Sequence, residues 1–371
     1  MKELNDIIFA YDKAVAQNKK TALATVVRVE GSSYRRPGAR MLVTEDGELT
    51  GAISGGCLEG DALRKARFAM FEQQNKLEIY ETTDEKDARL GVQLGCNGVV
   101  YILFEPIKNE DPNNPVNLLK RTVVKRKDAV IATVFNPRNK RQQTGTCCFI
   151  DDDDKILLGN YADIEAEAQT FLREKKSVVK EYDDGCVLYQ FIPPSIQLVL
   201  VGAGNDAQPL TELAYLLGWD TIIVDGRPAY ATRERFPKAG RICMVKPAEV
   251  LSAVDIDKQT AVVLMTHNYD YDMAALEQLI RTNCRFIGVL GPKKKLQKML
   301  DDLTGKGIKI DNEAITRIYG PVGLDIGAET SEEIALSILS EIKAAFSDRK
   351  GTSLKERIIE IHERSTNREH E

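Results

Sequence analysis

The sequence predicts an α/β protein: a Rossmann-like, doubly wound parallel sheet in the C-terminal half and an α+β domain of many short strands before it. Two observations lead to this fold class. From residue 196 onward, a short apolar run leads into a glycine-rich turn, a helical pattern and a second apolar run, which is the order of a β-α-β unit. Before residue 193, short strand patterns separated by turns outnumber helical ones.

The length of 371 residues favours more than one core. Pro193-Pro194 stands where the strand-rich half gives way to the β-α-β unit. We expect an α+β domain at 1–192, a Rossmann-like domain at 193–350 and a helical tail at 351–371. No internal repeat is apparent in the residue pattern.

In the N-terminal half, periodicity predicts helices at 4–16, 58–73, 118–127 and 161–175. Strands are predicted at 21–30, 48–53, 77–82, 99–104, 129–135, 147–150, 155–158, 177–182 and 186–192. The adjacent Cys147 and Cys148 lie within a strand, so their side chains point to opposite faces and both are interpreted as structural.

The loop after the first strand, residues 31–43, carries Arg35, Arg36 and Arg40 next to two serine hydroxyls. Arginines and hydroxyls on a loop between strands can hold a phosphate or another anion by charge-assisted hydrogen bonds. A solvated hairpin loop explains the same residues equally well.

Two further loops place a cysteine among small residues. Gly55-Gly56-Cys57 precedes a helix, where backbone approaches a ligand closely and the helix dipole favours a thiolate. Gly95-Cys96-Asn97 occupies a second glycine-rich loop. A buried packing role is the ordinary alternative for a single cysteine. The sequence does not show whether these loops meet.

In the C-terminal half, Gly202, Gly204 and Ala207 form a G-x-G-x-x-A turn, with Asn205 inside it. Such a turn lets a pyrophosphate approach the backbone and a helix N-terminus. Asp225 follows the first glycine by 23 positions (225 − 202), as expected for an acid that binds ribose hydroxyls. NAD(P) is therefore a candidate cofactor. A Rossmann scaffold without a dinucleotide stays open, because Asp206 at the helix start repels phosphate.

Arg227 stands two positions after the acid and can stack on adenine or reach a 2′-phosphate. His267 ends the strand predicted at 260–266, where it either faces the ligand crevice or caps the next helix. No tyrosine–lysine or histidine–carboxylate motif is recognised around it. Further helices are predicted at 270–281 and 331–346, strands at 221–224, 240–244 and 285–290, and a glycine-punctuated loop at 317–328.

Composition narrows the class of protein. The 51 basic and 56 acidic residues give a formal charge of −5, which argues against a nucleic-acid partner. The seven cysteines include no C-x-x-C pair, so neither a disulfide framework nor a zinc site is predicted. No stretch reaches the eighteen or so apolar residues of a membrane span. We expect a cytoplasmic protein without a membrane partner.

Several of these segments together resemble the XdhC/CoxI family of accessory factors for xanthine dehydrogenase and related molybdenum hydroxylases. The N-terminal likeness lies in GSSYRRPGARMLV and SGGCLE between Gly31 and Glu59, and in LGCNG at 94–98, where Asn97 replaces a glycine. In the C-terminal half, GAGNDAQPL, VDGRP, THNYDYD, IGVLGP and PVGLDIGAETSEEIA are similar in order and spacing. GAGND departs from the commoner GAGH turn. The resemblance covers about residues 8–345.

The resemblance implies a chaperone that binds molybdenum cofactor, protects it and hands it to an apo molybdenum hydroxylase, without turnover of its own. It implies Cys96 as the thiolate contact to the metal, Cys57 as second choice, and Arg35, Arg36 and Arg40 as anion contacts. Cysteine desulfurase is a further candidate partner. A homodimer is expected because Rossmann edges and a terminal helix offer surfaces for it.

Two other functions stay open. One is an NAD(P)-dependent oxidoreductase using the turn at Gly202 and Asp225, with His267 as acid–base. The other is a nucleotide-sensing regulatory module in which the Rossmann half controls docking to a partner enzyme.

Overall fold

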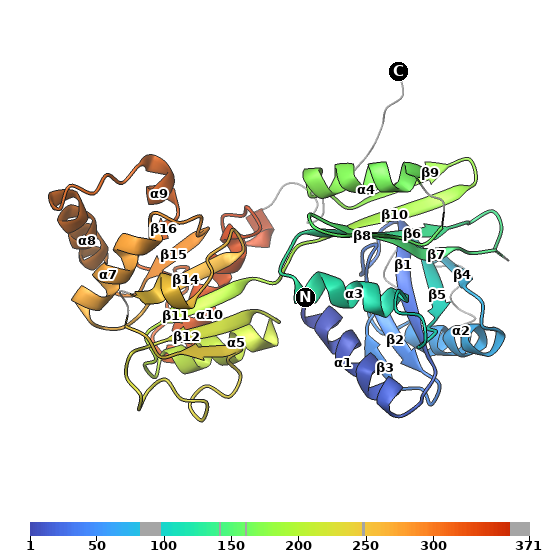
Figure 1. Ribbon diagram of the computed structural model, residues 1–371, viewed down its shortest axis with the longest axis horizontal. Helices are drawn as coiled ribbons and strands as arrows, with labels where there is room; N and C mark the ends of the chain where they lie inside the picture. Colours follow the sequence, from blue (N-terminus) through green and yellow to red (C-terminus); the bar gives the residue numbers. More distant parts are fainter. Residues whose placement is uncertain (82–97, 141, 160–161, 247–248, 357–371) are drawn as a thin grey trace, which may run out of the picture. The chain divides into compact units, whose positions relative to one another are not determined.

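The chain divides into two compact units, Met1–Pro194 and Ser195–Glu371, each with its own sheets and apolar core (Figure 1). The computed structural model describes residues 1–81, 98–140, 142–159, 162–246 and 249–356. The predicted fold class is confirmed: unit 1 has antiparallel sheets of short strands, and unit 2 has a parallel sheet between helices.

The first sheet of unit 1 has the strand order β3-β2-β1-β5-β4 and is antiparallel throughout. Its strands are β1 (Thr21–Gly31), β2 (Arg40–Thr44), β3 (Leu49–Gly51), β4 (Lys76–Glu81) and β5 (Gly98–Pro106), with α1 (Lys2–Ala16) before them and α2 (Glu59–Glu72) between β3 and β4. Helix α2 packs on this sheet through small buried residues, Ala62, Ala66 and Ala69, which recur at helical spacing and let the helix approach the strands closely.

The second sheet repeats this arrangement with the order β8-β7-β6-β10-β9. Its strands are β6 (Ala129–Phe135), β7 (Gly145–Asp151), β8 (Lys155–Leu157), β9 (Val178–Tyr182) and β10 (Gly185–Ile192), with α3 (Pro115–Val124) before them and α4 (Ala162–Glu174) between β8 and β9. The element order α-β-β-β-α-β-β and the strand order are the same in both halves. Unit 1 therefore consists of a first repeat (residues 2–106) and a second repeat (residues 115–192). The topology shows this repeat, although the residue pattern does not.

The two sheets of unit 1 pack face to face. Leu23 and Leu42 of the first repeat share one apolar cluster with Ile131 and Phe149 of the second. Helices α2 and α4 cover the two outer faces, so unit 1 has four layers, helix–sheet–sheet–helix (Figure 1). The inner faces of the two sheets therefore bury apolar side chains against each other.

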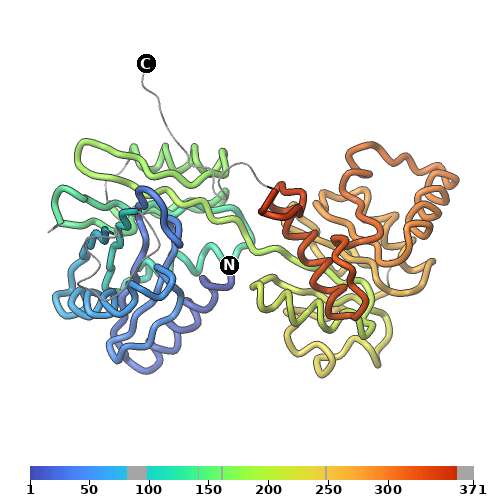
Figure 2. The backbone as a smooth tube through the Cα atoms, turned by 180° about the vertical axis from the view of Figure 1, so that it is seen from behind, coloured from blue at the N-terminus to red at the C-terminus, as the bar shows by residue number. Residues whose placement is uncertain are grey.

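Unit 2 has one parallel sheet of order β13-β12-β11-β14-β15-β16. Figure 2 traces the chain through these elements from the yellow-green of β11 to the red of α10. The strands are β11 (Gln197–Val201), β12 (Asp220–Val224), β13 (Arg241–Cys243), β14 (Thr260–Leu264), β15 (Phe286–Val289) and β16 (Ile318–Tyr319). Helices α5 (Ala207–Leu216) and α10 (Ser331–Ala345) share one core cluster with the sheet, and α7 (Tyr269–Leu279) and α8 (Lys293–Gly305) share the other.

Several short or polar elements of unit 2 differ from the prediction. The segment expected as a loop at 317–328 contributes the sixth strand, β16, which pairs with β15 through Ile318 and Tyr319. Helix α8, which was not predicted, begins in the lysine run 293–295. Its polar sequence contains only two buried apolar residues, Met299 and Leu303, and this weakens the helical pattern. The short helices α6 (Val250–Ala253) and α9 (Asn312–Thr316) are also absent from the prediction. A two-residue strand has no periodicity of its own, so only its neighbour defines it.

Candidate functional site

The predicted loops of the first repeat leave the same end of the first sheet. Antiparallel pairing sets Gly31, at the end of β1, opposite Gly98, at the start of β5. Met41, near the start of β2, lies opposite Gly51, at the end of β3. The loops 32–39 and 52–58 therefore both lie at the end of the first sheet where Gly31, Gly51 and Gly98 stand. We call these two loops the loop end. Segment 82–97 is joined to the same end, because Glu81 and Val99 are paired.

The two loops of the loop end contact each other. A Cβ placed on Gly55 would lie 3.7 Å from Cγ of Tyr34, so the exposed Tyr34 ring covers this glycine. A Cβ on Gly98 would lie 2.3 Å from the carbonyl oxygen of Ser32. Only glycine fits at position 98, because the backbone of the arginine loop passes directly over it. The arginine loop and the Gly55-Gly56-Cys57 loop thus meet. The meeting of the two cysteine loops, which the sequence left open, involves Cys96 and lies outside the described residues.

The Gly55-Gly56-Cys57 loop is held in shape by Ser54 and Glu59. The Ser54 hydroxyl accepts the N–H groups of Gly56 and Leu58, each at 3.1 Å, and donates to the Glu59 carboxylate. Gly56 has a φ of 109° and nothing within 4 Å of its Cβ position. Cys57 is a free, half-buried thiol just before α2. Among the described residues, the loop therefore leaves the backbone at Gly56 uncovered, while Cys57 packs partly against the core of the first repeat.

The three predicted arginines have different surroundings. Arg36 is exposed, and no carboxylate of the described residues lies within ion-pair distance of it. Arg35 pairs with Glu3 of α1, while its buried Nε finds no acceptor among the described residues. Arg40 is only 1% exposed and donates to the carbonyl of Gly38 at 3.0 Å.

Burial lowers the pKa of Arg40 to about 10, although Glu105 and Glu3 act in the opposite direction. Its guanidinium lies in the interior of unit 1 rather than in the exposed loop. The predicted residues Gly95, Cys96 and Asn97 lie outside the described residues.

In unit 2, the predicted glycine turn lies between two adjacent parallel strands, β11 and β14, whose chains continue toward opposite edges of the sheet. This is the position at which open α/β sheets bind ligands. Gly202 has a φ of 118°, and a Cβ there would lie 2.6 Å from the Met265 carbonyl oxygen. We call residues 202–206 and 266–268 the switch crevice.

The predicted ribose acid, Asp225, is bonded within its own chain. Its carboxylate accepts the N–H of Ala203 at 2.7 Å and both the backbone and the side chain of Arg227. Burial raises the pKa of the Asp225 carboxyl, but the bonds from Arg227 and Ala203 outweigh this and lower it. Arg227 in turn lies 4.0 Å from the centre of the Tyr230 ring.

His267 has a carboxylate partner that the sequence did not reveal. Its Nε2 lies 3.0 Å from Oδ2 of Asp206 at the start of α5. No motif in the sequence revealed this pair, because the two residues stand far apart in the chain and meet only where β11 and β14 pair. Asn205 accepts a hydrogen bond from Arg235 at 3.1 Å, and Gly204 lies under the His267 ring.

Reasoning from the sequence missed Tyr34, Ser54, Glu59 and Arg235. Ser54 and Glu59 have a local signal, since a hydroxyl and a carboxylate flank the double glycine before a helix. The contacts of Tyr34 and Arg235 depend on tertiary packing. Within the described ranges, no group of three or more histidine, cysteine or acidic residues is arranged to hold a metal ion.

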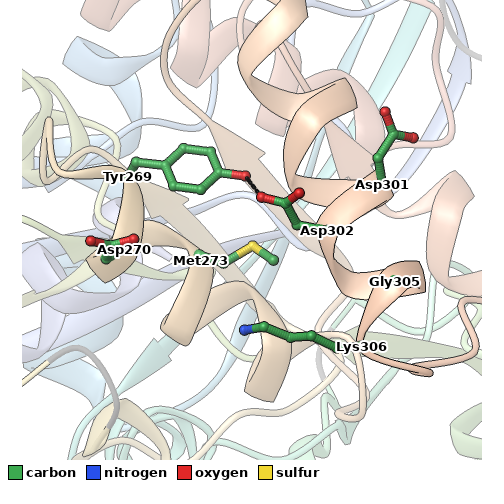
Figure 3. A pocket seen from close by; sticks show the side chains of 7 residues that line it. All are labelled: Tyr269, Asp270, Met273, Asp301, Asp302, Gly305 and Lys306. Atoms are coloured by element: carbon green, nitrogen blue, oxygen red, sulfur yellow. Dashed lines mark hydrogen bonds between the residues drawn. The ribbon is translucent and has the colours of Figure 1, made fainter.

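A separate depression of about 440 Å³ lies between α7 and α8 (Figure 3). Tyr269, which lines it, donates to Asp302 at 2.7 Å, and burial raises the pKa of Tyr269 to about 12. None of the predicted site residues lines it. The full lining is Tyr269, Asp270, Met273, Asp301, Asp302, Gly305 and Lys306.

No described helix combines the length and the apolar character required to cross a membrane.

Known proteins similar to this chain share its organisation. Residues 14–81 match a family described as the XdhC and CoxI family, and residues 198–342 match the XdhC Rossmann domain. A solved Bacillus halodurans structure described as a xanthine dehydrogenase superposes with a TM-score of 0.75 at 28% identity, covering 94% of this chain and 98% of that one.

Two curated relatives also match over most of their length. The Escherichia coli (strain K12) molybdenum cofactor insertion chaperone PaoD is 23% identical, over 89% of this chain and 85% of that protein. A Bacillus subtilis (strain 168) protein, named as a probable subunit of xanthine dehydrogenase, is 32% identical, over 89% of this chain and 94% of that protein. The chain therefore belongs to the XdhC and CoxI family.

Proposed function

We propose that this protein is a maturation factor that binds molybdenum cofactor at the loop end of unit 1 and delivers it to a molybdenum hydroxylase of the xanthine dehydrogenase type. One observation carries the proposal: strand register brings the arginine loop, the glycine–cysteine loop and both attachment points of segment 82–97 to one end of one sheet. The names of the relatives, an insertion chaperone and part of a xanthine dehydrogenase, support the same role.

The described residues suit the two ends of such a cofactor. Molybdenum cofactor carries a phosphate and a soft metal–sulfur centre. Exposed Arg36 and the backbone at Gly56 are donors that suit a phosphate, and Arg35 of the same loop has a buried Nε that finds no acceptor among the described residues. Thiolates suit the metal end. In the enzyme that receives it, the cofactor supplies redox chemistry; this chain binds it and shields it from water.

We assign the metal contact to the thiolate of Cys96, flanked by Gly95 and Asn97, with Cys57 as second choice. Cys96 stands two positions before Gly98 in the sequence, and Gly98 is in contact with the arginine loop. Arg40 is left out of the proposed contacts, because its guanidinium is buried and bonded to Gly38.

Co-purification tests the proposal. The protein is produced anaerobically in a host that makes molybdenum cofactor, and molybdenum and pterin are measured for wild type, Cys96→Ala, Cys57→Ala and Cys148→Ala. Cys148 is a buried strand residue of the second repeat and serves as a matched cysteine control. We expect near-stoichiometric pterin and molybdenum in wild type and the control, and loss of molybdenum in Cys96→Ala.

Wild-type protein free of pterin, with a known carrier loaded in parallel, would refute the carrier function. Loss in Cys57→Ala but not in Cys96→Ala would keep the carrier function and move the thiolate to the start of α2.

The proposal extends to partners. We expect a cytoplasmic homodimer that binds the apo molybdenum hydroxylase, with a cysteine desulfurase as a second partner. Light scattering after gel filtration measures the dimer. Pull-down with purified apo-hydroxylase and desulfurase, with and without cofactor loading, measures the partners; failure of loaded protein to retain the hydroxylase would contradict direct delivery.

A further inference from the structure

The switch crevice of unit 2 has the architecture of a dinucleotide site, but its polar groups are bonded to the chain itself. A bound dinucleotide needs three things there: free turn amides, a carboxylate for the ribose hydroxyls, and a helix N-terminus open to the pyrophosphate. One turn amide, that of Ala203, and the carboxylate are bonded to side chains of unit 2, and a carboxylate paired with a histidine stands at the start of α5. These contacts are independent of the function proposed for unit 1.

The carboxylate of Asp225, which would accept the ribose hydroxyls, already accepts hydrogen bonds from the chain itself. The Asp225 carboxylate accepts four hydrogen bonds: from the Ala203 N–H, and from the N–H, Nε and Nη2 of Arg227, at 2.7 to 2.9 Å. A carboxylate offers about four acceptor positions, so none remains for a ribose. One of these donors, Ala203 N–H, belongs to the glycine turn itself. Asp225 is only 6% exposed.

The phosphate position carries a negative charge. Asp206 stands immediately before α5, and its carboxylate is bonded to His267 Nε2 across the crevice. A pyrophosphate that approached the start of α5 would meet this carboxylate and would have to displace the histidine. On the outer side of the turn, Arg235 donates to the Ala203 carbonyl at 3.2 Å and to Asn205.

The position of His267 is fixed by hydrogen bonds of the residue before it. His267 has a φ of 57°, an uncommon left-handed conformation for a residue with a side chain. The preceding Thr266 donates through both its backbone N–H and its hydroxyl to Asp272, which is fully buried and paired with Lys295 at 2.6 Å. This buried pair fixes the loop that presents His267 to Asp206.

We propose that the switch crevice is a dinucleotide site closed by two internal contacts: Arg227 occupies the ribose acceptor, and the Asp206–His267 pair occupies the pyrophosphate position. Asp206 and Arg227 are then the residues that exclude ligands containing ADP-ribose. Removal of both side chains opens the site while the glycine turn and Asp225 remain.

Calorimetric titration of NAD⁺, NADH, NADPH and ADP-ribose into the full chain tests this. Wild type is expected to bind each of them more weakly than about 1 mM, and the double variant Asp206→Ala/Arg227→Ala to bind NADH and ADP-ribose at least tenfold more tightly. Glu234→Ala, an exposed neighbouring charge, is the matched control and is expected to behave like wild type.

Micromolar binding of any of these ligands by wild type would overturn the proposal, and so would a folded double variant that binds no more tightly than wild type. If thermal melting shows that the double variant does not fold, Asp206→Asn decides by the same criterion. It keeps the side-chain shape and removes the charge, and a gain of less than threefold in NADH affinity would overturn the closed-site assignment.

Discussion

The two repeats of unit 1 share one topology but use their connecting loops differently. In the first repeat, the connections at the loop end are long, and the side chains of Arg36 and Tyr34 are exposed. In the second repeat, the corresponding connections are shorter or tied down. Asp183-Asp184 alone joins β9 to β10, whereas residues 82–97 join β4 to β5.

The hairpin loop of the second repeat illustrates the difference. Gln143 accepts the Asn136 N–H at 2.8 Å and donates back to the Asn136 carbonyl at 2.9 Å, which closes the loop on itself. Asn136 also donates to the carbonyl of Asp184. Polar groups that hold a loop together are not available to a ligand. The two repeats therefore differ in how many polar loop groups are left for a ligand, while the shared scaffold decides only where the loops meet.

The largest expected contrast concerns the cysteines of the two repeats. Burial raises the pKa of both Cys147 and Cys148 to about 12, which leaves roughly one thiol in 10⁴ ionised at pH 8. Cys57 of the first repeat is half-buried beside open glycines. We expect iodoacetamide at pH 8 to alkylate Cys57 in the native protein and to leave Cys147 and Cys148 unmodified until urea unfolds it, as read by peptide mass spectrometry. Equal native rates for Cys57 and Cys148 would contradict this difference between the repeats.

The first residues of β5 and β10 are both glycines packed on backbone. A Cβ would lie 2.3 Å from the Ser32 carbonyl oxygen at Gly98, and 2.9 Å from the Phe135 carbonyl oxygen at Gly185. We expect Gly98→Ala to cost about 3 kcal/mol of unfolding free energy and Gly185→Ala about 1–2 kcal/mol. Only Gly98→Ala should also lose pterin, measured on protein that remains folded. Equal pterin loss in both variants would contradict cofactor binding at the loop end.

Arg36 and Arg138 occupy the hairpin loops of the two repeats and form a matched pair. Arg36 is exposed with no ion pair to a described residue, whereas Arg138 donates to the Asp183 carbonyl at 3.5 Å. We expect Arg36→Ala to weaken cofactor binding about tenfold, by roughly 1–2 kcal/mol, through loss of one charge-assisted contact. Arg138→Ala should leave the affinity unchanged. A pterin fluorescence titration measures both, and a larger loss in Arg138→Ala would reverse the assignment of the site.

Glu105 forms a hydrogen bond between the two repeats, so its titration tests the contact between them. It belongs to β5 of the first repeat and accepts the N–H of Thr146, in β7 of the second, at 2.6 Å. Burial raises the pKa of Glu105, with the Thr146 bonds and Arg40 opposing the shift. A raised folded-state pKa means that stability is greatest below the unfolded value of about 4.3 and falls as the pH rises through the folded value.

Glu105→Gln does not titrate, so wild type should lose on the order of 1 kcal/mol relative to this variant between pH 4 and pH 8. Urea unfolding at both pH values measures the difference. A relative gain for wild type on raising the pH would contradict the assigned direction.

The elements with a strong local pattern were predictable from the sequence, and those defined by their neighbours were not. The strand–turn–helix from Gln197 to Leu216 combines an apolar run, glycines and helical spacing, and each part indicates the same unit. Strand β16 has only two residues. The repeat is shared in topology but not in recognisable residues, because many apolar side chains satisfy the same buried position.

Site prediction followed the same division. Glycines, arginines and cysteines mark candidate ligand-binding loops by composition, so Arg36 and Gly56 could be proposed without a structure. Partners across the chain could not: Asp206 and His267 meet only through β11 and β14, and the buried position of Arg40 depends on the packing of two sheets. A sequence shows which side chains can donate or accept hydrogen bonds. The tertiary fold decides which of them are already bonded to other residues of the chain.

The face-to-face arrangement of two equal repeats has an evolutionary consequence. Two copies of one α-β-β-β-α-β-β module, stacked through their inner sheets, have the form of a symmetric dimer whose two chains have been fused into one. In a homodimer every substitution appears in both copies at once. Fusion removes that constraint, so one repeat can keep a long β4–β5 connection while the other joins the corresponding strands through two residues.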